Sequence, residues 1–261
     1  MKKLFIIILC SIALIGCGSG STAAFDKDNA ITVFDTEIGK VFTDTNSEKG
    51  KSVIITGQVF QILDDNKVML YYSPDTSENN YIVQLNSDMK VQEKENLIIN
   101  GVVTGTETYK NQLGTDVTVP LIKADSIEKT TIYEVVAPSQ KTVNVNKTIT
   151  KSNISVTLQK IEFAKNETRA FVQINNNTTG EMDPDQYNSK LIVNGNQYKY
   201  NYTYVDGYET LDDSIVAKAK DSGVLTFSGV SDYENKKASI VINFYDMDYN
   251  TISFTFDTTV K

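Results

Sequence analysis

The sequence predicts a mainly β chain with two folded domains, a small five-stranded barrel followed by a β-sandwich. Three observations indicate this: short runs rich in β-branched residues, alternation of apolar and polar residues in several of these runs, and glycines or turn residues at their boundaries. We expect the barrel over 28–128, a linker over 129–147 and the sandwich over 148–261.

The first 16 residues have the pattern of a secretory signal peptide. Lys2 and Lys3 give a positive start, and the apolar run over 4–15 contains 12 residues. A helix needs about 18–20 residues to span a bilayer, so this run is too short for a membrane span. It fits the hydrophobic region of an export signal.

The export segment ends in Leu14-Ile15-Gly16-Cys17. These residues resemble the bacterial lipobox, in which a small residue precedes a cysteine that is diacylated and then freed by a dedicated signal peptidase. The resemblance implies that Cys17 carries acyl chains such as palmitate and that the mature chain is lipid-anchored on the outer side of the cell membrane. Two or more chains, at about 0.8 kcal/mol per buried methylene, make such anchoring stable. Residues 17–27, rich in small side chains, are expected to form a flexible tether.

The amino-acid composition limits how the exported part can be stabilised and indicates its source. Without residues 1–16 the chain has 33 acidic and 23 basic residues, and its single cysteine is Cys17. The folded part therefore has no disulfide, and its stability must come from a buried core. Abundant Lys, Asn, Ile and Tyr, one arginine (Arg169) and no Trp or His indicate an AT-rich genome, and we expect a Gram-positive firmicute.

Five strands are predicted in the first domain. Two of them contain an internal glycine, Gly57 and Gly101, of the kind that marks a bulge or sharp bend in a curled strand. A Ser73-Pro74-Asp75 turn separates the second strand from the third. The predicted strands are 52–62, 67–72, 81–85, 97–104 and 116–127.

Three stretches of the first domain resemble the oligonucleotide/oligosaccharide-binding (OB) fold of bacterial exported proteins. They are the residues 50–59 (GKSVIITGQV), 97–105 (LIINGVVTG) and 119–124 (VPLIKA). The resemblance covers about 80 residues and implies a five-stranded, curled barrel. Members of the family differ in their ligands, so the fold by itself indicates no function.

The second domain is predicted to contain about seven short strands after a linker with Ala137-Pro138-Ser139-Gln140. Asn194-Gly195 between two apolar runs predicts a hairpin with a type I′ turn. The strands expected here are 153–158, 170–174, 191–193 with its partner from 196, 224–227, 238–244 and 251–256.

This half resembles the immunoglobulin-like modules of firmicute lipoproteins that are known as domains of unknown function. The resemblance rests on residues 154–163 (ISVTLQKIEF), 171–177 (FVQINNN) and 222–227 (SGVLTF). It implies an immunoglobulin-like sandwich. The cysteine–tryptophan–cysteine pattern of antibody domains is absent from the sequence.

The residue inventory excludes most catalytic machinery. Without histidine or a free mature cysteine, the chain cannot form a Ser-His-Asp triad, a Cys-His pair or a His-ligated zinc site. Ser87 and Lys90 match the Ser-x-x-Lys pattern of penicillin-recognising enzymes. Those enzymes also need a Lys-Thr-Gly strand, which the sequence lacks. Adjacent acids such as Asp64-Asp65 and Asp212-Asp213 are typical of solvated surface. We therefore expect no enzyme and no cofactor.

A weak calcium candidate lies at Asp246, Asp248 and Asn250, which match the opening of an EF-hand loop. The sixth position of that loop must be glycine, and here it is Thr251. The alternating residues that follow predict a strand, which would carry Asp257 about 15 Å away from the turn. A polar hairpin tip is the favoured interpretation.

A row of four tyrosines, Tyr198, Tyr200, Tyr202 and Tyr204, has a period of two. On a strand these side chains would share one face. Exposed, they would form an aromatic platform for sugar rings or peptide side chains; buried, they would be a row of the core. Because Lys199, Asn201 and Thr203 alternate with them, we expect burial.

The charge distribution argues against nucleic acid as a partner. Residues 25–140 contain 18 acidic and 10 basic residues, and 141–261 contain 15 and 13, whereas phosphate binding needs a basic groove. We expect a tethered module that binds or scaffolds at the cell envelope, toward a protein, peptide or glycan. A carboxylate-dependent envelope enzyme and a small-ligand site in the barrel mouth are the alternatives.

Overall fold

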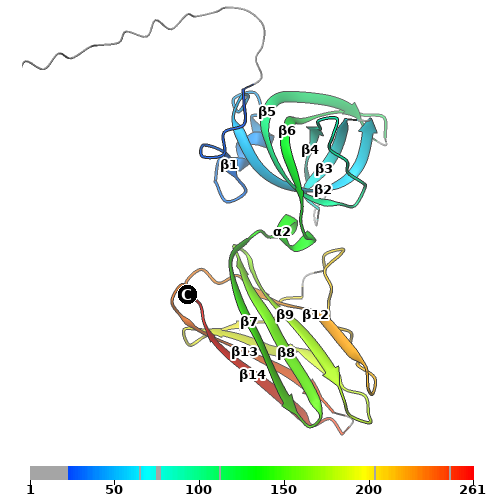
Figure 1. The fold of residues 1–261 in the computed structure, drawn as a ribbon, viewed down its shortest axis with the longest axis vertical. Coiled ribbons are helices and arrows are strands. Elements are labelled where there is room, and N and C mark those ends of the chain that lie inside the picture. The colour runs from blue at the N-terminus through cyan, green and yellow to red at the C-terminus, as the bar shows by residue number, and fades with distance from the viewer. Residues whose placement is uncertain (1–22, 65, 75–77, 112, 203, 247) are drawn as a thin grey trace, which may run out of the picture.

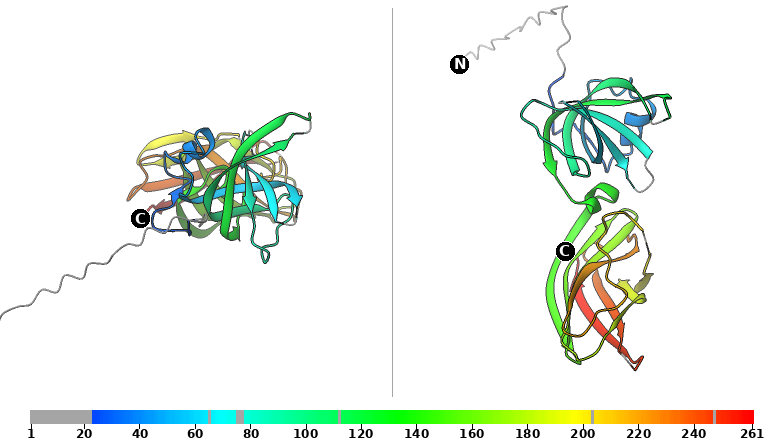
Figure 2. Two further views of the ribbon diagram at one scale, coloured as in Figure 1. Left: turned by 90° about the horizontal axis from the view of Figure 1, so that it is seen from above. Right: turned by 90° about the vertical axis from the view of Figure 1, so that its right-hand side faces the viewer.

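The computed structural model describes residues 23–261 except 65, 75–77, 112, 203 and 247. It shows a closed barrel and a two-sheet sandwich with the short helix α2 (Ile132–Val136) between them (Figure 1). The predicted fold class, a five-stranded barrel followed by a β-sandwich, is confirmed. A view turned by 90° about the vertical axis shows the same succession of barrel, α2 and sandwich (Figure 2, right).

Five long strands close the barrel in the order β2-β3-β4-β6-β5, with β5 pairing back onto β2. All neighbours are antiparallel except β4 and β6, which are parallel. This strand order and its one parallel pair are those of the OB fold. The strands are β2 (Ser52–Asp64), β3 (Lys67–Ser73), β4 (Glu78–Gln84), β5 (Asn96–Lys110) and β6 (Asp116–Lys129).

The two predicted glycines permit closure in different ways. Gly101 lies at a register shift between β5 and β6, and a Cβ there would be 2.5 Å from the main-chain oxygen of Lys123. Gly57 is not at a bulge; its missing side chain leaves room for the hydroxyl of Tyr81 and the carbonyl of Tyr71. Both positions need glycine because a neighbouring strand comes too close for any side chain.

The N-terminal segment completes the barrel core. β1 (Ile31–Thr32) pairs parallel to the start of β2, and α1 (Ile38–Thr43) packs Ile38 and Val41 against the barrel interior. The interior face of the strands supplies the remaining apolar residues, and the buried Tyr81 donates from its hydroxyl to the carbonyl oxygen of Thr56 over 3.0 Å. Burial of this apolar surface, at about 25 cal/mol per Å², is the main force that holds the domain together.

The predicted linker over 129–147 is corrected by the structure. β6 continues to Lys129, α2 follows, and β7 already begins at Ser139. β7 pairs with β8 at the edge of its sheet, where Val143, Val145 and Ile149 pack against the sandwich core. Its outward positions are Asn, Lys and Thr, so an edge strand has the composition of a polar connection.

Eight strands in two four-stranded sheets form the sandwich. One sheet has the order β12-β9-β8-β7 and the other β11-β10-β13-β14, and a shared core lies between them. The strands are β7 (Ser139–Lys151), β8 (Ile154–Ala164), β9 (Glu167–Asn176), β10 (Asp183–Val193), β11 (Asn196–Lys199), β12 (Lys220–Ser228), β13 (Lys237–Tyr245) and β14 (Thr251–Thr259).

The Asn-Gly hairpin is confirmed. Val193 pairs with Asn196 across a two-residue loop, and Asn194 and Gly195 have φ angles of 51° and 82°. Positive φ at both central positions is what a type I′ turn requires, and Asn and Gly adopt it at low cost. The turn fixes the register of β11, which bears on the tyrosine row described below.

Candidate functional site

The predicted lipid-attachment residue Cys17 lies outside the described residues. The described part of the tether begins at Ala23, and Phe25 is half-buried where the chain reaches the barrel. Over the residues that the structure describes, no helix has the length and apolar character needed to cross a bilayer.

The tyrosine row does not form one inward face, so the expected burial is wrong for half of it. Tyr198 and Tyr200 are half-buried and pack against the sandwich core. Tyr202 is 59% exposed and Tyr204 is 79% exposed. β11 ends at Lys199, and the main-chain N–H of Asn201 donates to Thr226 on the other sheet. Because the chain is no longer a β-strand after Lys199, its side chains stop alternating between two faces.

The weak calcium candidate forms a hairpin tip. The carboxylate of Asp246 accepts hydrogen bonds from the main-chain N–H of Asp248 and from the main chain and side chain of Asn250, at 2.8–3.2 Å. These bonds lower the pKa of Asp246, with the Asn250 N–H the largest cause. Asp257 lies far along β14, opposite Ser239. Asp246 therefore closes the β13–β14 turn.

The Ser-x-x-Lys pattern lies in a turn. Ser87 and Asp88 form the turn that follows β4, and no helix begins there. The main-chain N–H of Met89 donates to Asn86, closing this turn. The pattern therefore lacks the helical setting that its catalytic use needs.

A groove on the outer face of the barrel was not predicted from the sequence. It has a volume of about 630 Å³ and lies between the outward residues of β2–β4 and the tip of the β5–β6 hairpin. Phe60 stacks on Tyr71 with ring centroids 3.9 Å apart, and Leu113 at the hairpin tip is 89% exposed. Its lining residues are Phe60, Gln61, Tyr71, Asn80, Tyr109, Lys110, Asn111 and Leu113.

Several polar groups also line this groove. The side-chain oxygen of Asn80 is buried and has no hydrogen-bond partner among the described residues. Asn111 accepts from the main-chain N–H groups of Leu113 and Thr115, at 3.0 and 2.9 Å, which fixes the hairpin tip. Lys110 pairs with Asp116 at 2.8 Å. Apolar walls with few polar groups are the usual make-up of a ligand site.

One pattern in the sequence could have revealed the groove. Inward residues of β3 and β4, such as Leu70 and Tyr81, alternate with Tyr71 and Asn80. Outward aromatic positions on successive strands indicate a surface platform. The curl of the β5–β6 hairpin, which brings Leu113 to these strands, depends on tertiary structure.

A buried charge cluster surrounds the single arginine. Arg169 is fully buried and lies 2.9 Å from Glu162 and 3.0 Å from Glu167. Its Nη1 also donates to the carbonyl oxygens of Tyr133 and Ala137 at 2.7 and 2.8 Å. The hydrogen bonds of this cluster join β8 and β9 of the sandwich to α2. Buried carboxylates of this kind can mark an active site, but here Arg169 pairs with both and Lys160 also pairs with Glu162, which gives the cluster a structural role.

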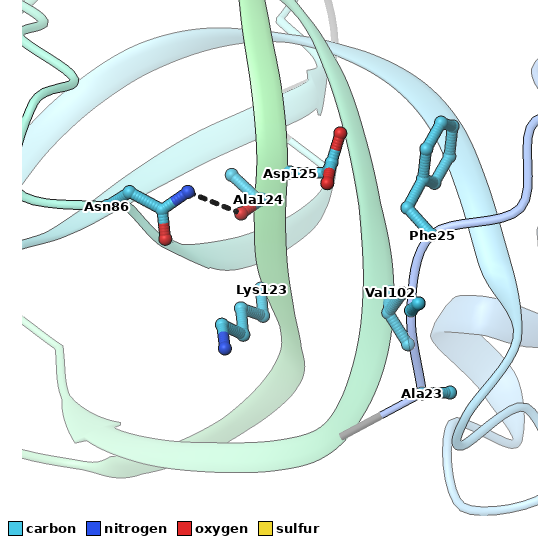
Figure 3. A pocket seen from close by; sticks show the side chains of 8 residues that line it. Ala23, Phe25, Asn86, Val102, Lys123, Ala124 and Asp125 are labelled. Atoms are coloured by element: carbon cyan, nitrogen blue, oxygen red, sulfur yellow. Dashed lines mark hydrogen bonds between the residues drawn. The ribbon is translucent and has the colours of Figure 1, made fainter. Parts of the chain in front are cut away.

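A smaller pocket of about 240 Å³ lies where residues 23–25 meet the barrel (Figure 3). Ala23 and Phe25 form one wall, and Lys123 and Asp125 of β6 line the other side. The side chain of Asn86 donates to the carbonyl of Ala124 at 3.3 Å. Because the N-terminal residues themselves supply a wall, we interpret this pocket as the junction between these residues and the barrel.

No family model matches the chain, and no curated protein is similar to it. A functionally unknown protein from Listeria monocytogenes EGD-e matches with 9% identity and a TM-score of 0.40, covering 51% of this chain and 94% of that one. The archaellum periplasmic stator protein FlaG from Sulfolobus acidocaldarius matches with 16% identity and a TM-score of 0.22, covering 44% of this chain and 98% of that one.

Proposed function

We propose that this chain is a lipid-anchored, extracytoplasmic lipoprotein of a Gram-positive bacterium that binds a glycan or peptide of the cell envelope without catalysis. Residues 14–17 support the anchor. One observation carries the binding role: the aromatic groove formed by β2, β3, β4 and the β5–β6 hairpin tip. In OB folds this face, with the loop between the last two strands, holds oligomeric ligands.

The chemistry of the groove favours a neutral or weakly charged ligand. Phe60, Tyr71 and Tyr109 offer flat apolar surface, and the Asn80 oxygen offers an acceptor. The barrel segment 25–140, with 18 acidic and 10 basic residues, would repel a polyanion. Sugar rings and peptide side chains combine apolar faces with hydrogen-bond donors, so they match these walls better than nucleic acid does.

Anchoring is tested by Cys17→Ala in cells. The variant is expected to appear in the medium or to remain uncleaved, because it cannot receive acyl chains at this position. Cell fractionation with detection of the chain size measures this. If the variant stayed in the membrane at mature size, the lipid-anchor proposal would be wrong.

Binding is tested with residues 17–261 carrying Cys17→Ser, sedimented with insoluble peptidoglycan. We expect the parent to co-sediment and Leu113→Ser to weaken binding about fivefold or more, as for a central contact. Leu113 is 89% exposed, so this change should not unfold the barrel. Val216→Ser is the matched control, since Val216 is 60% exposed on the sandwich. Equal binding of both variants, or no binding of the parent, would overturn the groove as the site.

A further inference from the structure

A second exposed aromatic surface lies on the sandwich, which we call the tyrosine edge: Tyr187, Tyr200, Tyr202 and Tyr204. Tyr187 is 78% exposed and meets Tyr200 edge-to-face, with ring centroids 5.6 Å apart. Tyr200 donates from its hydroxyl to Gln186 at 2.9 Å, which fixes its ring. Soluble domains seldom leave several large aromatic side chains exposed together unless they form an interaction face.

Buried side chains and a main-chain hydrogen bond hold the loop that carries most of this edge. Val205, Tyr208, Leu211 and Ile215 of the loop over 200–217 are buried, each at 8% exposure or less. The main-chain N–H of Val224 on β12 donates to the carbonyl of Glu209 at 2.7 Å. Since the backbone is pinned at several points, the outward side chains are presented on a pre-organised support, which lowers the entropy cost of binding.

The loop of the edge carries only carboxylates, whereas the exposed Lys190 and Lys199 pair with each other on the neighbouring strands β10 and β11. Residues 200–217 contain four carboxylates and no lysine or arginine, and all four carboxylates are exposed. Within the described part of the chain, none of them lies in an ion pair, whereas Glu162 and Glu167 both pair with Arg169. Asp213 lies close enough to Tyr200 to help raise the pKa of that hydroxyl, after burial and the neighbouring tyrosines. The four are Asp206, Glu209, Asp212 and Asp213.

We propose that the tyrosine edge docks a lysine- or arginine-bearing segment of a partner protein. The aliphatic stem of such a side chain packs on an aromatic ring, and its cation is attracted both to the ring face and to a carboxylate. Asp213 beside Tyr200, in a loop that contains no lysine or arginine, provides the complementary charge. This surface is separate from the barrel groove, so its function does not depend on the proposed glycan or peptide site.

The probe is a synthetic peptide of alternating lysine and serine, added to residues 17–261 carrying Cys17→Ser. Fluorescence anisotropy of the dye-labelled peptide measures binding, because the chain has 14 tyrosines and its own fluorescence would not single out the edge. We expect saturable binding that weakens as salt is raised, because the ionic part is screened. The double variant Tyr202→Ala/Tyr204→Ala should weaken binding about fivefold or more. Its melting temperature should equal that of the parent, because both residues are exposed.

Tyr249→Ala provides the matched control. Tyr249 is 82% exposed at the β13–β14 tip and stands beside Asp246 and Asp248, so it has the same kind of neighbours elsewhere on the domain. The proposal requires that this variant bind the peptide like the parent. Equal weakening by Tyr249→Ala would mean general attraction to an acidic protein and would overturn it. Unchanged binding of the double variant, or binding of a peptide with glutamate in place of lysine, would overturn it as well.

Discussion

Arg169 donates from Nη1 to the carbonyl oxygen of Ala137 at 2.8 Å, so a strand of the sandwich holds the residue that follows α2. The same nitrogen donates to Tyr133 at 2.7 Å. The Tyr133 carbonyl also accepts from the main-chain N–H of Ala137 at 3.0 Å, and a cation beside the carbonyls at a helix C-terminus is favourable. Ile132 of α2 also packs on Val205 and Tyr208. The segment after the barrel is therefore anchored to the sandwich.

Replacing Arg169 by Met should destabilise the sandwich severely. Glu162 and Glu167 are 5% and 6% exposed; the variant would remove the cation of Glu167 and leave Glu162 with Lys160 alone. Breaking a buried pair in this way typically costs about 3–5 kcal/mol. Urea denaturation of the whole chain measures the loss. Lys110→Met, which removes an ion pair with both side chains largely exposed, is the control and should cost below about 1 kcal/mol. Similar losses for the two variants would show that the cluster is not what holds this region.

The position of α2 predicts where the chain can be cut into two fragments that fold independently. Residues 23–130 and 131–261 should each unfold cooperatively, since each contains its own core. A sandwich fragment that starts at 139 should be less stable than 131–261 by at least about 1–3 kcal/mol, because Arg169 loses two carbonyl acceptors. Denaturant titration compares the two. Equal stability would place α2 outside the folded sandwich, and failure of both domains to fold alone would reject the division.

Tyr202→Ala should leave the stability of the sandwich within about 0.5 kcal/mol of the parent, because the side chain is 59% exposed. Phe254→Ala, in the same domain and fully buried, should cost about 3–5 kcal/mol through the lost contacts and the cavity. Thermal and urea unfolding of both variants give the comparison. A severe loss for Tyr202→Ala would restore the inward-packed row that its period of two predicts.

Acid should weaken the barrel through two glutamates. A hydrogen bond from Lys51 lowers the pKa of Glu48, and one from Lys129 lowers the pKa of Glu95. A carboxyl group whose pKa is lower in the folded than in the unfolded chain stabilises the fold above its unfolded pKa, near 4.5, and loses this effect as pH falls through the folded value. Denaturation midpoints of the barrel should therefore fall below about pH 4.5. The variant Glu48→Gln/Glu95→Gln should start less stable at pH 7 and show a flatter pH dependence; an unchanged slope would contradict this.

The sequence alone determined the strands that carry a regular pattern and a strong turn. Period-two alternation places Ile154, Val156 and Leu158 in the core, and the Asn194-Gly195 turn follows from the two residues that tolerate positive φ. Gly57 and Gly101 marked the close approaches of a curled barrel. These features are local, because each depends on neighbouring residues and on the backbone geometry of a single strand.

Tertiary structure decided the rest. Alternation assigns side chains to faces only while the backbone stays extended, and it says nothing about which neighbour covers a face. β11 ends at Lys199, so Tyr202 and Tyr204 point to solvent although their spacing matches a core row. β7 resembles a polar connection until pairing with β8 makes it a strand. The barrel groove exists because the β5–β6 hairpin brings Leu113 to Phe60 and Tyr71, residues more than 40 positions away in the chain. Contacts of this kind depend on packing between segments that are distant in the sequence, and no local sequence pattern encodes that packing.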